Sequence, residues 1–117
     1  MENKEFAKIL EKRTLDFAIA IIRLSAKLPD TTEGRVIKNQ ITKSGTSVGA
    51  NYREANRARS KPDFRNKIKI CEGEASETQY WLEIVADIEW KTLDQLKAEY
   101  EECSELLAIF TSIGNKS

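Results

Sequence analysis

Apolar side chains recur every three or four residues along most of the chain, a pattern typical of amphipathic helices that pack against one another. The first such segment predicts a helix over residues 5–28. Pro29 ends it, because the residue before a proline is forced out of the helical region. The main apolar row is Phe6, Leu10, Phe17, Ile21, Leu24 and Leu28, and an adjoining second row is Leu15, Ala18 and Ile22.

A second helix is predicted over about residues 33–59, after a loop at residues 30–34. Its core row is Ile37, Ile41, Val48, Tyr52 and Ala55, with Ser44 or Gly45 at the remaining step. Ser60 followed by Asp63 resembles a capping box, which indicates that a third helix begins at once. The connection is therefore very short, and the two helices are expected to lie antiparallel and side by side.

The third helix is predicted over residues 61–89 and carries two apolar rows. The first has the alternating spacing of a left-handed bundle seam and consists of Phe64, Ile68, Cys71, Ala75, Thr78, Leu82 and Val85. The second consists of Ile70, Trp81, Ile84 and Ile88. Two interpretations of this second row remain open: a wide core face, or a surface buried against another subunit.

A second capping-box pattern, Thr92 with Gln95, predicts the start of a fourth helix that runs to about residue 113. Its apolar row is Leu93, Leu96, Tyr100, Cys103, Leu107 and Phe110. Gly114 is expected to end this helix, and residues 115–117 are expected to fray. The alternation typical of strands is missing from the sequence. The pattern predicts one all-α domain over residues 1–117, an up-down-up-down antiparallel four-helix bundle.

Charge is balanced over the whole chain, with 19 Lys and Arg against 19 Asp and Glu, but it is divided along the sequence. From Arg35 to Lys69 there are ten basic and two acidic residues, and from Glu72 to Glu105 eleven acidic and two basic ones. Pairing between neighbouring helices or subunits is the favoured interpretation, and a basic face for a partner is the alternative.

Several basic residues cluster around the short connection near residue 60, and such a cluster suits sequence-independent, salt-sensitive contacts with phosphates. A solvated helix face is an equally good explanation of the stripe on the second helix. The candidate nucleic-acid-binding residues are Arg35, Lys38, Lys43, Arg53, Arg57, Arg59, Lys61, Arg65, Lys67 and Lys69.

The run from Gly45 to Gly49 matches the G-x-S-x-G motif of hydrolases, but that motif lies between a strand and a helix and needs a histidine base. The chain contains no histidine, so we expect no enzymatic activity. The same run is also G-x-x-x-G, in which small side chains let two helices approach closely. Gly45 and Gly49, with Tyr52, Ser60 and Asp63, are therefore assigned structural roles.

No metal, cofactor or small-molecule substrate is expected. The carboxylates Glu54, Glu72, Glu74 and Glu77 lack the Glu-x-x-His pairs of a di-iron bundle, which favours solvated or ion-paired roles. Cys71 and Cys103 fall at apolar positions, typical of buried thiols in a reducing compartment. Trp81, next to Tyr80, fits a core or interface position better than a base-stacking platform.

The first ten residues lack the apolar core of a secretory signal, and no apolar run approaches the roughly 18 residues of a membrane span. We therefore expect a cytoplasmic protein that has no contact with a membrane.

One long block, SGTSVGANYREA from Ser44 to Ala55, resembles a known family of small bacterial four-helix-bundle proteins. These are named for open reading frames in intervening sequences of 23S ribosomal RNA, and the accessory variability determinants of diversity-generating retroelements are their relatives. The matching positions elsewhere are Leu15-Asp16-Phe17-Ala18, Leu28-Pro29, Gln40, Ser60, Asp63-Phe64, Lys67, Glu74-Ala75, Glu77-Thr78 and Tyr80-Trp81-Leu82-Glu83.

The resemblance implies a four-helix bundle that assembles into a homopentameric ring, which would bury the second apolar rows. Residues Ile70, Trp81, Ile84 and Ile88 are the candidate oligomer interface. The retroelement relatives associate with RNA and a reverse transcriptase through basic surface. This chain departs from the family at Lys43, where many relatives carry arginine, and at Gly73, where lysine is usual. Both departures weaken the transfer of a nucleic-acid role.

Two functional hypotheses follow. The first is a non-enzymatic, oligomeric bundle that binds structured RNA or a nucleoprotein partner through the basic residues around the second and third helices. The alternative is a structural or adaptor protein that binds a protein partner, whose basic and acidic segments pair within or between subunits.

Overall fold

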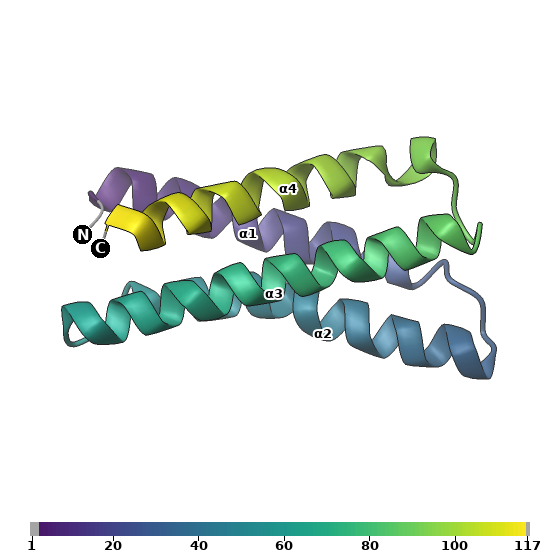
Figure 1. Cartoon of the computed structure of the whole chain (residues 1–117), viewed down its shortest axis with the longest axis horizontal. Helices are drawn as coiled ribbons and strands as arrows, with labels where there is room; N and C mark the ends of the chain where they lie inside the picture. Colours follow the sequence, from purple (N-terminus) through teal and green to yellow (C-terminus); the bar gives the residue numbers. More distant parts are fainter. Residues whose placement is uncertain (1–2, 117) are drawn as a thin grey trace.

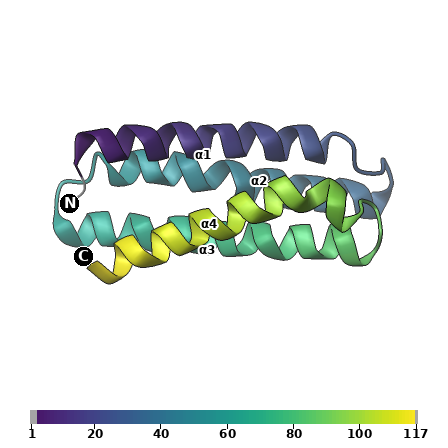
Figure 2. The ribbon, with the colours of Figure 1, turned by 90° about the horizontal axis from the view of Figure 1, so that it is seen from above.

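The computed structural model describes residues 3–116, which form four long helices in one elongated bundle (Figure 1). The helices are α1 (Lys4–Ser25), α2 (Thr32–Ala55), α3 (Lys61–Asp87) and α4 (Leu93–Lys116). Each helix runs opposite to the one before it (Figures 1 and 2), and the bundle measures 44 × 24 × 20 Å. The predicted all-α class and its four helices are confirmed.

The backbone N–H groups in the first turn of a helix have no partner within the helix. At the start of each helix, a capping side chain accepts a hydrogen bond from one of these groups. Asn3, Thr31 and Ser60 cap α1, α2 and α3 in this way. At the start of α4 the bonding is reciprocal. The N–H of Thr92 donates to Gln95 Oε1 at 2.9 Å, and the N–H of Gln95 donates to Thr92 Oγ1 at 3.1 Å. Both capping sites predicted from the sequence are present.

Three predicted helix ends were wrong. Helix α1 stops at Ser25 instead of residue 28, because the N–H groups of Lys27 and Leu28 bond three residues back. Helix α2 stops at Ala55 instead of residue 59, because the N–H groups of Arg57 and Ala58 bond three residues back and tighten the chain into a turn. Helix α4 continues through Gly114 to Lys116. No glycine among the described residues has a positive φ, so Gly114 does not form the left-handed cap that would end the helix. Residue 117 lies outside the described part of the chain.

The core lies along the bundle axis, where each helix contributes one face. All seven seam residues predicted on α3 are buried. The rings of Tyr52 and Phe110 meet in the interior with their centroids 5.5 Å apart. Three predicted core positions near helix ends or on the outer side of α4 are exposed instead: Phe6, Leu93 and Tyr100. Leu106, which does not belong to the predicted row, is fully buried.

Small residues let α2 approach α1 closely in the middle of the bundle. A Cβ atom at Gly45 would lie 2.8 Å from Cγ2 of Ile21, and one at Gly49 would lie 2.9 Å from Oγ1 of Thr14. Carbon atoms do not pack this tightly, so a larger residue at either position would push the helices apart. The glycines therefore set the separation between α1 and α2.

Gly34 is buried in the first turn of α2, although the sequence pattern predicts a loop at this position. Its N–H donates to Thr31 Oγ1 at 3.0 Å. A Cβ atom at this position would overlap the carbonyl oxygen of Pro29, so the chain can reverse direction here only if residue 34 has no side chain.

Hydrogen bonds between polar side chains inside the bundle join neighbouring helices. Thr78 Oγ1 lies 2.8 Å from Ser44 Oγ and thereby joins α3 to α2. Thr42 Oγ1 donates to Ser25 Oγ at 3.0 Å and joins α2 to the end of α1. Within residues 3–116, no helix has both the length and the apolar character needed to cross a membrane.

Candidate nucleic-acid interface

Five exposed cations surround the connection between α2 and α3, and we call this group the basic rim. It consists of Arg53, Arg57, Arg59, Lys61 and Arg65. The connection lies at the end of the bundle where α1 begins and α4 ends (Figures 1 and 2). The rim exists because the α2–α3 connection is short, so that basic residues from the end of one helix and the start of the next are brought together.

Neighbouring acidic side chains pair with only some of the cations in the basic rim. Arg53 Nε lies 3.9 Å from Glu11 Oε1, a long and exposed contact that contributes little to stability. Within residues 3–116, Arg57, Arg59 and Lys61 make no ion pair. Their charges are therefore available to an external anion.

The other five predicted basic residues are not part of the rim. Arg35 is about 27 Å from Arg53 of the rim along the axis of α2, and it pairs with Asp30 at 3.2 Å. Lys38 is near Arg35, Lys43 is at the middle of α2, and Lys67 and Lys69 lie further along α3. The structure thus divides the ten candidates into one cluster and five scattered positions.

Lys43 lies close to the carboxylates of α3. Desolvation raises the pKa of Glu74 above its usual value, the neighbouring charge of Glu77 raises it further, and Lys43 opposes the rise. Lys43 therefore acts on an acidic part of the surface, and it does not extend the rim.

A groove of about 580 Å³ runs between α1 and α2 next to the rim. Arg53 and Arg57 of the basic rim line it together with the acidic residues Glu11 and Glu54. The apolar and small residues that line it are Leu15, Ala18, Ile19, Ile22, Gly49 and Ala50. Leu15, Ile19 and Ile22 are all exposed, and together they form an apolar patch along the groove of the kind that marks an interaction surface.

The second apolar row of α3 lies outside the core. Ile70 and Ile88 are exposed, and Ile88 has 48% of its surface in contact with solvent. Trp81 and Ile84 are partly buried. Trp81 Nε1 donates to Glu77 Oε2 at 3.0 Å, and the ring of Tyr80 meets the ring of Trp81 edge-on. The outer surface of α3 thus exposes Ile70 and Ile88, whereas Trp81 packs against the core.

The acidic side chains of α3 and α4 have partners that sequence reasoning missed. Arg13 of α1 donates to both oxygens of Glu102 at 2.7 Å and to Glu105 at 2.6 Å. The hydrogen bond with Glu102 is the main reason why the pKa of Arg13 rises above its usual value. Glu72 accepts a hydrogen bond from Thr111. The spacing of residues within one helix cannot predict these contacts, because each contact depends on how two helices are rotated about their axes.

The two thiols have the properties of interior groups. Cys71 and Cys103 are buried and unpaired with each other. Burial raises the pKa of each thiol to about 12, so both stay protonated and unreactive near neutral pH. Residues 3–116 contain no cluster of three or more acidic, cysteine or histidine side chains that could hold a metal ion.

Comparison with known proteins agrees with this geometry. The family described as 23S rRNA-intervening sequence protein matches residues 8–112. The chain belongs to this family. The fold of the 23S rRNA-intervening sequence protein is also found in a crystal structure from Bacteroides thetaiotaomicron. That structure is described as a protein with unknown function from the S23 ribosomal protein family.

The likeness to the Bacteroides protein is extensive, with a TM-score of 0.83 and 38% sequence identity, and it covers 89% of this chain and 96% of the other. No curated protein matches the chain. The predicted family is confirmed, and the further kinship with retroelement proteins stays a prediction.

Proposed function

We propose that this protein is a non-enzymatic, oligomeric bundle that binds structured RNA, alone or within a nucleoprotein, through the basic rim. The observation that carries the proposal is the exposure of Arg57, Arg59 and Lys61 without ion-pair partners among the described residues. Three cations, two on the α2–α3 connection and one at the start of α3, can contact successive phosphates of a backbone. Such contacts do not depend on base sequence.

The oligomer part of the proposal rests on apolar surface. Helix α1 exposes Leu15, Ile19 and Ile22 along the α1–α2 groove, and α3 exposes Ile70 and Ile88 on a different helix. Contact between two unlike surfaces of successive copies is head-to-tail, and such contacts close into rings when the rotation allows it. We propose a homopentameric ring, in which the basic rim would be repeated and could bind RNA multivalently.

The test is binding of the purified protein to a panel of structured RNAs over a series of salt concentrations, measured by fluorescence anisotropy. We expect affinity to fall steeply with salt and to vary little with sequence. The variant Arg57→Glu/Lys61→Glu should weaken binding to all the RNAs by at least about tenfold. It should also reduce the salt slope by roughly one for each phosphate that the rim no longer neutralises.

The matched control is Arg35→Glu/Lys38→Glu, which makes the same change in charge on the far end of α2. It should bind like the wild type. Equal affinities of the rim variant and the wild type would contradict the assignment of the rim.

A second candidate function is that of an adaptor for a protein partner, with basic and acidic segments paired between subunits. Exposed carboxylates on α3 and α4, such as Glu77, Asp87 and Glu101, could pair with the basic rim of another subunit, and they favour this candidate. This candidate would replace the first if the wild type bound none of the RNAs at low salt while its oligomer dissociated as salt increased.

A further inference from the structure

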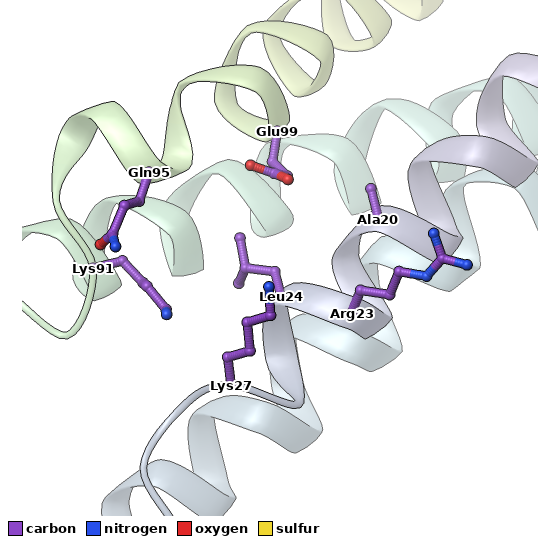
Figure 3. Close-up of a pocket in the computed structure, with 7 residues that line it drawn as sticks. All are labelled: Ala20, Arg23, Leu24, Lys27, Lys91, Gln95 and Glu99. Atoms are coloured by element: carbon purple, nitrogen blue, oxygen red, sulfur yellow. The ribbon is translucent and has the colours of Figure 1, made fainter.

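A charged groove of about 460 Å³ opens between α1 and α4 at the end of the bundle opposite the basic rim (Figure 3). Its volume falls within the range of small-molecule sites. It forms because α1 and α4 pack against each other less extensively than the other neighbouring helices. Its walls are Ala20, Arg23, Leu24 and Lys27 on the α1 side, Lys91 on the α3–α4 connection, and Gln95 and Glu99 on α4.

The lining carries more positive than negative charge. Arg23, Lys27 and Lys91 contribute three cations, and Glu99 contributes one carboxylate. Figure 3 shows the amino groups of both lysines turned toward the space below Glu99, whereas the guanidinium group of Arg23 points away from them. A surplus of cations that approach from two different elements favours an anionic ligand and disfavours a metal ion.

Hydrogen-bond donors also face the groove. Gln95 uses its side-chain oxygen to accept the backbone N–H of Thr92, as part of the cap of α4. Its amide nitrogen is therefore the end that can donate to a ligand. With the two lysines, the groove presents donors of three side chains to an anion.

The carboxylate of Glu99 indicates that the ligand must also donate a hydrogen bond. Its Oε1 atom is buried, and within residues 3–116 it accepts no hydrogen bond. A buried carboxylate oxygen without a donor destabilises the folded state, and such atoms are rare in native proteins unless they serve a purpose. In this groove, Oε1 of Glu99 can accept a hydrogen bond from the ligand whose negative charge the two lysines bind.

We propose that this groove binds a small phosphate monoester that carries N–H or O–H groups, as sugar phosphates and nucleoside monophosphates do. A phosphate monoester has close to two negative charges at neutral pH and several acceptor oxygens. Lys27, Lys91 and Gln95 bind the phosphate, and Glu99 accepts a hydrogen bond from the hydroxyl or amino group. This departs from the expectation that the chain binds no small molecule.

The experiment is isothermal titration calorimetry of the full chain with adenosine 5′-monophosphate, ribose 5-phosphate, adenosine, ribose and inorganic phosphate. The two phosphate esters should bind at least about tenfold more tightly than the compounds without phosphate and than phosphate alone. No saturable binding of either ester would overturn the proposal. Equal affinity for inorganic phosphate would also overturn it, because the groove would then be a simple anion site.

Four variants locate the site. Lys27→Gln and Lys91→Gln should each weaken binding of the esters by about tenfold. Lys97→Gln removes the same charge from an exposed position of α4 outside the groove, and it should have no effect. Arg57→Glu/Lys61→Glu, which changes only the basic rim, should also leave the affinity for the esters unchanged. The result therefore does not depend on whether the rim binds RNA.

Glu99→Leu separates a binding role from a structural one. Removal of an unsatisfied buried oxygen should raise the melting temperature, whereas loss of the acceptor should weaken binding of the esters. A purely structural residue would not show these opposite changes. If Glu99→Leu leaves the affinity unchanged, the proposal is wrong, and Glu99→Met, which has a similar length and no oxygen acceptor, gives the same comparison if the leucine variant does not fold.

Discussion

At the scale of single residues, the structure distinguishes four glycines that look alike in the sequence. Gly34 lies under the carbonyl oxygen of Pro29, and Gly45 and Gly49 lie against α1. Gly73 lies at a position of α3 with no atom within 4 Å of the place where a Cβ would be. The first three are required by packing, whereas Gly73 only reduces the stability of its helix.

Substitution of alanine should therefore have opposite effects at two glycines. Gly34→Ala should lower the free energy of unfolding by about 3 kcal/mol, because its methyl group would collide with backbone that cannot move away. Gly73→Ala should raise it by about 1 kcal/mol. Chemical denaturation monitored by circular dichroism measures both. Destabilisation by Gly73→Ala would show that the open space is filled, for example by a neighbouring subunit.

The thiols predict a dependence of stability on alkaline pH. Burial raises the pKa of Cys71 and of Cys103 from 9.0 to about 12 in the folded protein. The unfolded chain therefore loses these protons first, and the stabilising contribution is complete below about pH 9 and decreases as pH rises toward 12. The free energy of unfolding of a Cys71→Ala/Cys103→Ala variant should decrease less than that of the wild type over this interval. Parallel curves would contradict the raised pKa values.

At the scale of helices, α1 and α4 are joined by one strong polar contact. Arg13 holds Glu102 through two parallel hydrogen bonds in a partly buried position, the geometry in which an ion pair contributes most. Arg13→Gln should lower the free energy of unfolding by about 1 kcal/mol. Lys12→Gln is the control, because its pair with Asp16 is exposed and lies on one helix, and its effect should be within about 0.5 kcal/mol.

A double-mutant cycle with Glu102→Gln would assign the effect to the pair itself. A coupling energy near zero would show that Arg13 acts through its aliphatic part alone.

The spacing of apolar residues predicts the buried face of each helix, but it does not predict which positions along that face are buried. All seven residues of the α3 seam could be predicted, because neighbouring helices cover this face of α3 along its whole length. Leu93 fits the row of α4 and is still 77% exposed, because it is the first residue of its helix and lies along an open groove beside the end of α3. Periodicity assigns a residue to a face of its own helix, and it does not say how far the neighbouring helices extend.

The same limit applies to the candidate sites. The sequence places Arg35 and Arg53 on one stripe of α2, but they lie at opposite ends of that helix. The short connection after Ser60 allowed the basic rim to be predicted, because it brings the end of one helix to the start of the next. The groove around Glu99 could not be predicted, since its residues come from α1, the α3–α4 connection and α4 and meet only through the path of the whole chain.

At the scale of the whole molecule, the exposed apolar rows predict self-association. Leu15→Glu/Ile22→Glu, placed in the α1–α2 groove, should convert the oligomer into a smaller species with unchanged helix content, because a buried charge disfavours the contact between subunits. Light scattering coupled to size-exclusion chromatography measures this. The control is Leu93→Glu, at a more exposed apolar position outside the groove. A monomeric wild type at micromolar concentration would contradict the assembly.

The unequal packing of the four helices also determines how the bundle opens. Helices α2 and α3 share the most extensive interface, and the connection between them is short, whereas α1 and α4 touch least. A protein opens in cooperative units whose stability follows such differences. Backbone amides of α2 and α3 should therefore exchange with deuterium most slowly, and those of α4 earlier, since α4 is held mainly by α3 and only weakly by α1. The central hairpin would keep its structure while the outer helices detach and return.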